Sequence, residues 1–526
     1  ASRSSLFWIH TDPQSVPNGT SAEDLKRIRS HVMSEHNRKK RLENTKQYKS
    51  RACKQSAYRL ESTLSTPSDA AVELSGETNN GQTEFGSNDF TYEAILQDDT
   101  TVHTLPVPSQ AIAVTPWMGG PESIDPFGMS HTPLTDRMMR HLRHFLVDLS
   151  RDGVPFQNRR LDKIEKHWGA LVQQDPACLH ACICVASSDI ALKTGEFPLV
   201  DPTQPSSALL LDTFHHRGET IRLVNEGLSD PVKAASDGLI AAVSMLLTIE
   251  IATGTPAYLK MHLAGLRQMV RLRNTFTDVP YPIRYQISWT DIRVACMAHT
   301  KPIFPPVRNP RPSSIPIGSP TEYLAPLASR LFVLSQLTGA LSPVMSETIF
   351  DLVQLTWYAE CIKTSGHHVF DEQTEDYFNG EVLYVEYTLH NDRYMQNGEV
   401  KGDASIEGCV RLACLLFHNT TIWEFYPANA GIFPKPLVAL RMALETAIPS
   451  GYFHLCPDVL IWILVMGACS CNSLMAHERS YFVMELAHVI RAHGIHSWQE
   501  LRVLLMDFFY LDRTHLVPLR GLWDEI

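Results

Sequence analysis

Hydrophobic side chains recur at helical spacing along the chain from about residue 132 onward. Leu259, Leu263, Leu266 and Val270 follow one another at steps of four, three and four residues, which places them on one face of a helix. Similar patterns predict further helices near residues 138–146, 160–192, 213–228, 234–253, 284–299, 322–340, 346–363, 404–422, 434–447, 457–475, 480–492 and 497–511. The pattern therefore predicts an all-α fold, a large helical array.

Two segments interrupt this helical pattern. Val382–Tyr387 alternates in a strand-like way and is the best candidate for a strand, although the pattern is ambiguous. Lys301–Pro320 contains seven prolines, so we expect a loop that separates two groups of helices.

The first 130 residues are polar and rich in Ser, Thr, Gly, Asn and Asp, which argues against a buried core of their own. We therefore predict three parts. A basic N-terminal arm covers residues 1–60, an acidic flexible linker covers 61–130, and an all-helical regulatory domain covers 131–526. The N-terminal region up to residue 130 is expected to be disordered.

Charge is strongly segregated, although the whole chain has a net charge of -11. Residues 26–54 contain only two acids and eleven basic residues, namely Lys26, Arg27, Arg29, Arg38, Lys39, Lys40, Arg41, Lys46, Lys49, Arg51 and Lys54. From residue 61 to 136 there are twelve acids and no Lys or Arg. A basic block beside an acidic block indicates an interaction arm, whatever the total charge.

Two interpretations of the basic arm remain open. Lys26-Arg27, a ten-residue gap and then Arg38–Arg41 have the spacing of a bipartite nuclear import signal. The same side chains can neutralise DNA phosphates and release counterions, which gives affinity without sequence information. A leucine zipper is excluded because Leu60 and Leu64 are followed by Pro67 and polar sequence. The acidic linker is expected to compete with DNA for the arm.

Enzyme signatures are missing from the sequence. It contains no Gly-rich phosphate loop, no dinucleotide-binding fingerprint, no His-Glu-x-x-His pair and no nucleophile-elbow serine. All-helical terpene cyclases need an aspartate cluster for magnesium, and Asp98-Asp99 lacks the third acid. We therefore expect no catalytic site and no cofactor.

Metal and membrane sites are not expected either. The metal candidates Cys178, His180, Cys182 and Cys184 point to two different faces of a helix, so we expect buried core side chains there. The eleven cysteines show no regular pairing, which is typical of reduced thiols inside the cell. The longest apolar run, Val459–Cys469, is too short to span a bilayer, and we expect a soluble protein without a membrane partner.

Four separated segments resemble one protein family. They are Ile28–Met33 with Asn37–Arg41; Ile124–Phe127; His216–Asn225 with Leu228, Asp237–Gly254 and Met261–Arg273; and Trp498–Leu511 with Leu522–Glu525. Together they resemble the fungal-specific transcription factor domain proteins of the zinc-cluster regulator superfamily, including the "tachykinin family" type that lacks the zinc cluster. Members often place two glycines after the third segment, where this chain has Asn274 and Thr275.

The resemblance implies an all-α regulatory domain and a role in controlling transcription from the nucleus. Zinc-cluster regulators bind DNA through six N-terminal cysteines, but Cys53 is the only cysteine before Cys178. One structural zinc already needs four ligands, so this module is absent from the sequence. The chain then contacts DNA through its arm, acts through a partner regulator, or is preceded by a missing segment.

Three functions follow from these patterns. The first is a nuclear transcriptional regulator of a metabolic or biosynthetic gene set, with DNA, the import machinery and a homo- or heterodimer partner. The second is a helical co-regulator or scaffold that binds no DNA, and the third is an all-α enzyme. In the family-like segment, Glu250, His262 and Arg267 are expected to form an internal polar network. A small-molecule pocket between helices is the alternative there.

Overall fold

The computed structural model describes residues 134–156, 159–196, 207–253, 256–298, 300–315, 324–337, 339–366, 370–395, 397–423, 434–472 and 475–526. Over these ranges the regular elements are helices, and the β pairing consists of a single bridge between Tyr394 and Val400. The all-α prediction is confirmed. The predicted arm at 1–60 and linker at 61–130 lie outside the described residues.

The helices follow one another closely along the chain. They are α2 (Asp136–Arg143), η2 (His144–Leu149), α3 (Ser150–Asp152), α4 (Leu161–Gln174), α5 (Pro176–Lys193), α6 (Ala208–Leu228), α7 (Pro231–Ala234), α8 (Asp237–Thr253), α9 (Pro256–Val270), η3 (Phe276–Asp278), α10 (Tyr281–Ala298), α11 (Ser329–Ser335), α12 (Pro343–Ser365), α13 (Glu372–Asn391), α14 (Ile406–Phe417), η5 (His418–Ile422), α15 (Pro434–Ala447), α16 (Pro457–Ser470), α17 (Ala476–Ala492), α18 (Trp498–Leu505) and α19 (Asp512–Glu525). Here η2 and η5 are π-helical, whereas η3 is a 3₁₀ turn.

Local capping explains where several helices begin. The Asp175 carboxylate accepts a hydrogen bond from the Cys178 backbone N–H at 3.0 Å, and Pro176 occupies the first turn of α5. Proline suits this position because the first N–H groups of a helix have no intrahelical partner. The one helix predicted near 160–192 is therefore two, α4 and α5, which meet at Asp175.

Val382–Tyr387, the ambiguous candidate for a strand, is helical, because these residues lie inside α13. The Asp371 carboxylate caps this helix by accepting from the Thr374 N–H at 2.8 Å. Val382, Leu383 and Val385 are all buried, so the helix has apolar side chains on more than one face. That arrangement removes the helical periodicity from the sequence pattern.

The predicted proline-rich loop is confirmed over its described part, 301–315, which contains no helix. It is attached to α10 by Asp291, whose buried carboxylate accepts the N–H groups of Ile303 at 2.8 Å and Phe304 at 2.7 Å. Burial raises the pKa of Asp291 to about 7. The Asp291 carboxylate thus holds the first part of the loop against α10.

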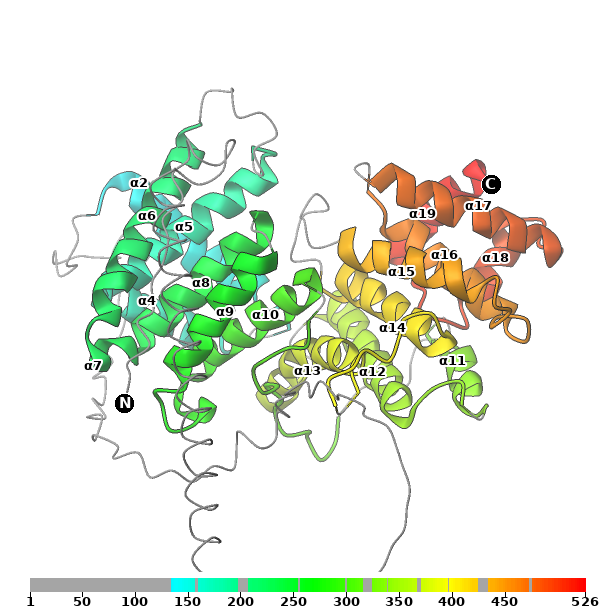
Figure 1. Ribbon diagram of the computed structural model, residues 1–526, viewed down its shortest axis with the longest axis horizontal. Coiled ribbons are helices and arrows are strands. Elements are labelled where there is room, and N and C mark those ends of the chain that lie inside the picture. Colours follow the sequence, from blue (N-terminus) through cyan, green and yellow to red (C-terminus); the bar gives the residue numbers. More distant parts are fainter. Residues whose placement is uncertain are drawn as a thin grey trace, which may run out of the picture. The chain divides into compact units, whose positions relative to one another are not determined.

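A main hydrophobic core runs through the described helices, which belong to a single compact unit, and a small second cluster joins Ala191 and Leu192 of α5 to Leu210 of α6. Helix α5 packs against α2, α4, α6 and α8, and α8 in turn packs against α9 and α10. Helix α10 also contacts α13, which joins the C-terminal helices through α12 and α14 (Figure 1). In this unit α10 therefore connects the N-terminal and C-terminal groups of helices.

Helix α5 is the helix of the described segments that is long and apolar enough to cross a membrane. Of its residues, 72% are buried against neighbouring helices. Burial of this kind is what a central core helix shows.

Candidate functional site

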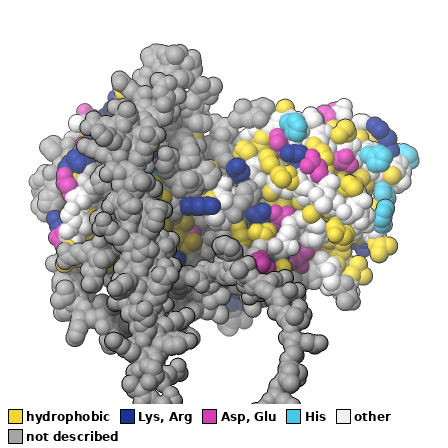
Figure 2. All heavy atoms as spheres, in the orientation of Figure 1, with side chains coloured by type: hydrophobic (Ala, Val, Ile, Leu, Met, Phe, Trp, Pro, Cys, Tyr) yellow, Lys and Arg dark blue, Asp and Glu magenta, His cyan; other side chains and the backbone are white. Residues whose placement is uncertain are grey.

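The eleven basic residues predicted to contact DNA or the import machinery lie outside the described residues. They are Lys26, Arg27, Arg29, Arg38, Lys39, Lys40, Arg41, Lys46, Lys49, Arg51 and Lys54. On the face that Figure 2 shows, the described Lys and Arg side chains are scattered among acidic and apolar ones. They form no broad basic patch on that part of the surface.

An ion pair joins two helices of the family-like segment. The Arg217 guanidinium of α6 forms an ion pair with the Glu250 carboxylate of α8, and both side chains are largely buried. On α9, burial and, to a smaller extent, the positive charge of Arg217 lower the pKa of His262 to about 4. Of the three residues predicted to form an internal network, Glu250 thus has a charged partner, Arg217, that the prediction did not include.

The turn that follows this segment is closed without the two glycines. The Thr275 N–H donates to the Asp278 carboxylate at 2.9 Å, and the two residues form a capping box around η3. The Arg273 guanidinium reaches back to Asp237 at 2.5 Å. Side-chain hydrogen bonds therefore stabilise the turn in this chain.

The candidate metal cluster in α5 does not converge. The Cys182 thiol faces the Met245 sulfur at 3.5 Å, whereas the Cys184 thiol donates to the Thr213 carbonyl of α6 at 3.1 Å. The described residues contain no group of three or more His, Cys, Asp or Glu side chains that could hold a metal ion. The prediction that these side chains point to different faces is confirmed.

His180 of α5 instead pairs with His216 of α6. Their Nδ1 atoms lie 2.7 Å apart, and both residues are buried. One ring must donate a proton while the other accepts it, so the pair requires at least one neutral imidazole. Burial, together with the neighbouring His180 and His215 rings, lowers the pKa of His216 to about 4.

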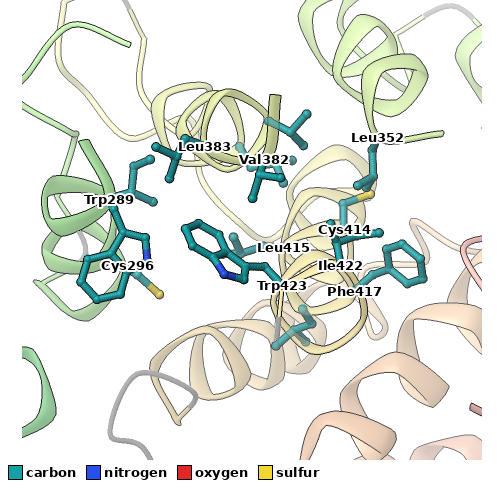
Figure 3. Close-up of a cluster of buried hydrophobic side chains, with 14 of the residues drawn as sticks. Trp289, Cys296, Leu352, Val382, Leu383, Cys414, Leu415, Phe417, Ile422 and Trp423 are labelled. Atoms are coloured by element: carbon teal, nitrogen blue, oxygen red, sulfur yellow. The ribbon is translucent and has the colours of Figure 1, made fainter. Parts of the chain in front are cut away.

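A second buried ionic centre lies between α10, α13 and η5. The Arg293 guanidinium donates to the Glu386 carboxylate at 2.5 Å and to the Asn419 side-chain oxygen at 3.0 Å. The side chains of Arg293 and Glu386 are 3% and 0% exposed. Trp289 and Trp423 belong to the buried hydrophobic cluster of Figure 3. Their ring centroids lie 6.0 and 5.5 Å from the Arg293 guanidinium carbon.

Arg293 connects three elements at this centre, because it lies on α10 and bonds to Glu386 of α13 and Asn419 of η5. A buried charge is tolerated only when it is paired and hydrogen-bonded, so Arg293 requires both α13 and η5 to remain in position. His418 also lies 3.9 Å from Glu386, and burial lowers the pKa of its imidazole. The ion pair therefore links the first group of helices to the C-terminal group.

A partly enclosed cavity with a volume of about 80 Å³ lies between η2, α4, α5, α8 and α10. Its lining is mostly apolar and includes five aromatic side chains, Phe145, Trp168, Tyr281, Tyr285 and Trp289. Ser150, Thr248 and Gln286 supply the polar side chains, and no charged side chain lines it. The Gln286 amide donates to the Thr248 hydroxyl at 3.0 Å.

Comparison with known protein families identifies this part of the chain. Residues 140–289 match the model of the family described as "Fungal specific transcription factor domain". The chain carries a fungal-specific transcription factor domain. No curated protein and no solved structure matches the chain.

The fungal-specific transcription factor domain runs from α2 into α10. Of the four segments that resembled this family, the third lies inside the match, whereas the other three lie outside it. A domain of this kind implies a fungal transcriptional regulator with a role in the nucleus, and the family is typically non-enzymatic. Every residue that lines the cavity falls within the domain.

Sequence reasoning missed the Arg293–Glu386 centre and the residues of the cavity. Arg293 is the only Lys or Arg between Arg284 and Lys301, and the four residues that follow it, Val294–Met297, are apolar. A charged residue beside such an apolar run is the signal that could have revealed a buried ion pair. Its partner, 93 positions away, could not be identified from the pattern.

Proposed function

We propose that this chain is a fungal transcriptional regulator that controls a gene set, of metabolic or biosynthetic genes, from the nucleus. The observation that carries the proposal is the family match at 140–289 on a chain that also has an isolated basic segment at 26–54. The two parts divide the work. The basic segment directs the protein into the nucleus and binds DNA. The helical domain controls the activity of the regulator.

The basic arm suits both tasks. Import receptors bind short cationic strands, and the pairs of basic clusters at Lys26-Arg27 and Arg38–Arg41 have the bipartite spacing. DNA binding through such a segment is electrostatic and therefore depends steeply on salt.

The helical domain contributes regulation and assembly in this proposal. The match to a typically non-enzymatic family supports a role without chemistry. Homo- or heterodimerisation through this domain would bring two arms to neighbouring DNA sites and raise their joint affinity.

Two arm variants with equal loss of charge test the proposal. Replacing Arg38, Lys39, Lys40 and Arg41 by Ala removes the second half of the bipartite signal. Replacing Lys46, Lys49, Arg51 and Lys54 by Ala removes the same charge outside it. The first variant is expected to stay in the cytosol, because it can no longer enter the nucleus. A reporter fusion of residues 1–60 with the same four substitutions should also stay in the cytosol, whereas the second variant should be nuclear.

Chromatin occupancy then separates import from DNA contact. If the arm binds phosphates, the nuclear second variant loses occupancy, and its purified form shifts DNA only at lower salt than the wild type. A wild-type protein that stays in the cytosol would refute the regulatory proposal. Normal occupancy by the second variant would restrict the arm to import.

A non-DNA-binding co-regulator is the second candidate. It is favoured by the cysteines of the given sequence, since Cys53 alone stands before Cys178 and one structural zinc needs four ligands. The co-regulator would co-purify with a zinc-cluster partner and would produce no salt-sensitive shift of DNA by itself. Measuring both properties on purified protein distinguishes the two functions.

A further inference from the structure

The partly enclosed cavity inside the fungal-specific transcription factor domain has the aromatic, mostly apolar lining of a small-molecule site. We propose that it binds an uncharged, single-ring aromatic molecule that carries one hydroxyl group. The proposal goes beyond the regulatory function and does not depend on it, because binding is a property of the helical domain whatever the arm does. Size, aromatic content and polar pattern each restrict the ligand.

The volume sets the upper size. A water molecule needs roughly 10–15 Å³ of such space, so a cavity of about 80 Å³ accommodates about five to eight water-sized groups. Pockets for drug-sized ligands are several times larger, in the range of roughly 300–1,000 Å³. An enclosed apolar cavity that holds one benzene ring measures roughly 150 Å³, so a single substituted ring enters this partly enclosed cavity only in part, and a nucleotide or a fused polycyclic molecule is too large.

The lining selects an aromatic, uncharged occupant. The Phe145 and Trp168 rings meet edge to face, with centroids 5.9 Å apart and an interplanar angle of 87°. Aromatic walls of this kind bind a further ring through the same edge-to-face and offset contacts. A carboxylate or an ammonium group would be desolvated without a counter-charge, because no Lys, Arg, Asp or Glu lines the cavity.

The Gln286–Thr248 pair determines where the hydroxyl group lies. The Gln286 amide donates to the hydroxyl oxygens of Thr248 at 3.0 Å and Thr290 at 3.4 Å, which orients it on α10. Ser150, the other polar side chain of the lining, donates its own hydroxyl to the Leu146 carbonyl. A ligand hydroxyl that reaches the Gln286–Thr248 pair joins an existing hydrogen-bond chain, which satisfies its own polar group on burial.

Trp289 connects the cavity to the buried ion pair of Arg293 and Glu386. It lines the cavity, and its ring centroid lies 6.0 Å from the Arg293 guanidinium carbon. An occupant would therefore contact α10 one turn before the ion pair that attaches this helix to α13. Helix α10 is thus the element through which binding reaches the C-terminal helices.

Isothermal titration calorimetry on the full 526-residue chain tests the proposal with phenol, toluene and benzoate as probes. We expect saturable binding of phenol, weaker binding of toluene, and binding of benzoate at least tenfold weaker than phenol. Two variants locate the site. Val185→Phe places a larger side chain in the cavity from α5 and should weaken phenol binding at least tenfold. The control Val503→Phe makes the same substitution at an exposed position of α18 and should leave phenol binding unchanged.

Thr248→Val tests the hydroxyl contact separately. It keeps the shape of the side chain and removes the oxygen that accepts from Gln286, so phenol should lose about three- to tenfold in affinity while toluene does not. No saturable phenol binding by the folded wild-type chain would overturn the proposal, and so would wild-type binding by a folded Val185→Phe variant. If circular dichroism shows that Val185→Phe has lost its helices, the Thr248→Val comparison decides, and equal losses for phenol and toluene refute the assignment.

Discussion

Removing the Arg293 side chain tests whether the buried ion pair holds the helical unit together. In the native structure its guanidinium donates to Glu386 at 2.5 Å and to Asn419 at 3.0 Å, with the two charged side chains 3% and 0% exposed. Arg293→Met keeps much of the apolar volume but leaves the Glu386 carboxylate without its counter-charge. We expect a large loss of stability because an unpaired carboxylate would remain in the interior.

The size of the loss follows from the burial of both partners. Breaking a buried ion pair by removing one member costs about 3–5 kcal/mol, since the remaining charge is desolvated and unpaired. Replacing both members by apolar side chains removes that penalty, so Arg293→Met with Glu386→Leu should be more stable than Arg293→Met alone. The expected difference is about 2 kcal/mol or more, which a double-mutant cycle resolves.

Urea unfolding followed by circular dichroism measures these differences in the free energy of unfolding. An exposed pair provides the control, because Arg222 contacts Glu219 at 2.9 Å with its side chain 52% exposed. Arg222→Met should therefore change the stability by less than about 1 kcal/mol. Similar losses for Arg293→Met and Arg222→Met, or additive effects in the double variant, would refute the assignment of a structural role to the buried pair.

Three further outcomes are expected. The pKa of His216 is lowered to about 4 from 6.5, so between these values the unfolded chain binds more protons than the folded one. Stability should therefore fall by up to about 3 kcal/mol from this group as the pH drops from 6.5 to 4, and His216→Gln should flatten that part of a plot of unfolding free energy against pH. Gly467→Ala should destabilise the chain by about 1–3 kcal/mol, because a Cβ there would lie 2.6 Å from the Phe482 ring. Gly169→Ala in α4 meets nothing within 4 Å, so it should be neutral or stabilising by up to about 1 kcal/mol, and thermal unfolding compares the two variants. Finally, we predict that the acidic residues 61–136 compete with DNA for the arm; deleting the linker should raise DNA affinity at low salt, and an unchanged affinity in a mobility-shift titration would rule this out.

Much of the helical architecture could be predicted from local pattern. Leu259, Leu263, Leu266 and Val270 form one face of α9 because a helix brings positions three and four apart to the same side. Local pattern is not informative where a helix is buried on several faces. In α13 the apolar residues lie on several faces, so Val382–Tyr387 showed no clear helical period and was an ambiguous candidate for a strand.

The candidate sites divide in the same way. The basic arm was found from the sequence alone, because a run of like charges is a property of adjacent residues. The ion pair between Arg293 and Glu386 and the aromatic cavity were not, since their members are far apart in the chain. Glu250 was recognised as a buried polar group, but its partner Arg217 was not identified.

The helical class, the separation of positive from negative charge and the resemblance to a regulatory family can be recognised in the amino-acid order alone. These features depend on residue order over short distances, which periodicity and composition record directly. Which charges are buried in pairs and which aromatic rings surround a cavity is established by the packing of the helices. Those contacts arise when helices pack, and the same helical face can meet different neighbours until the whole core closes around it.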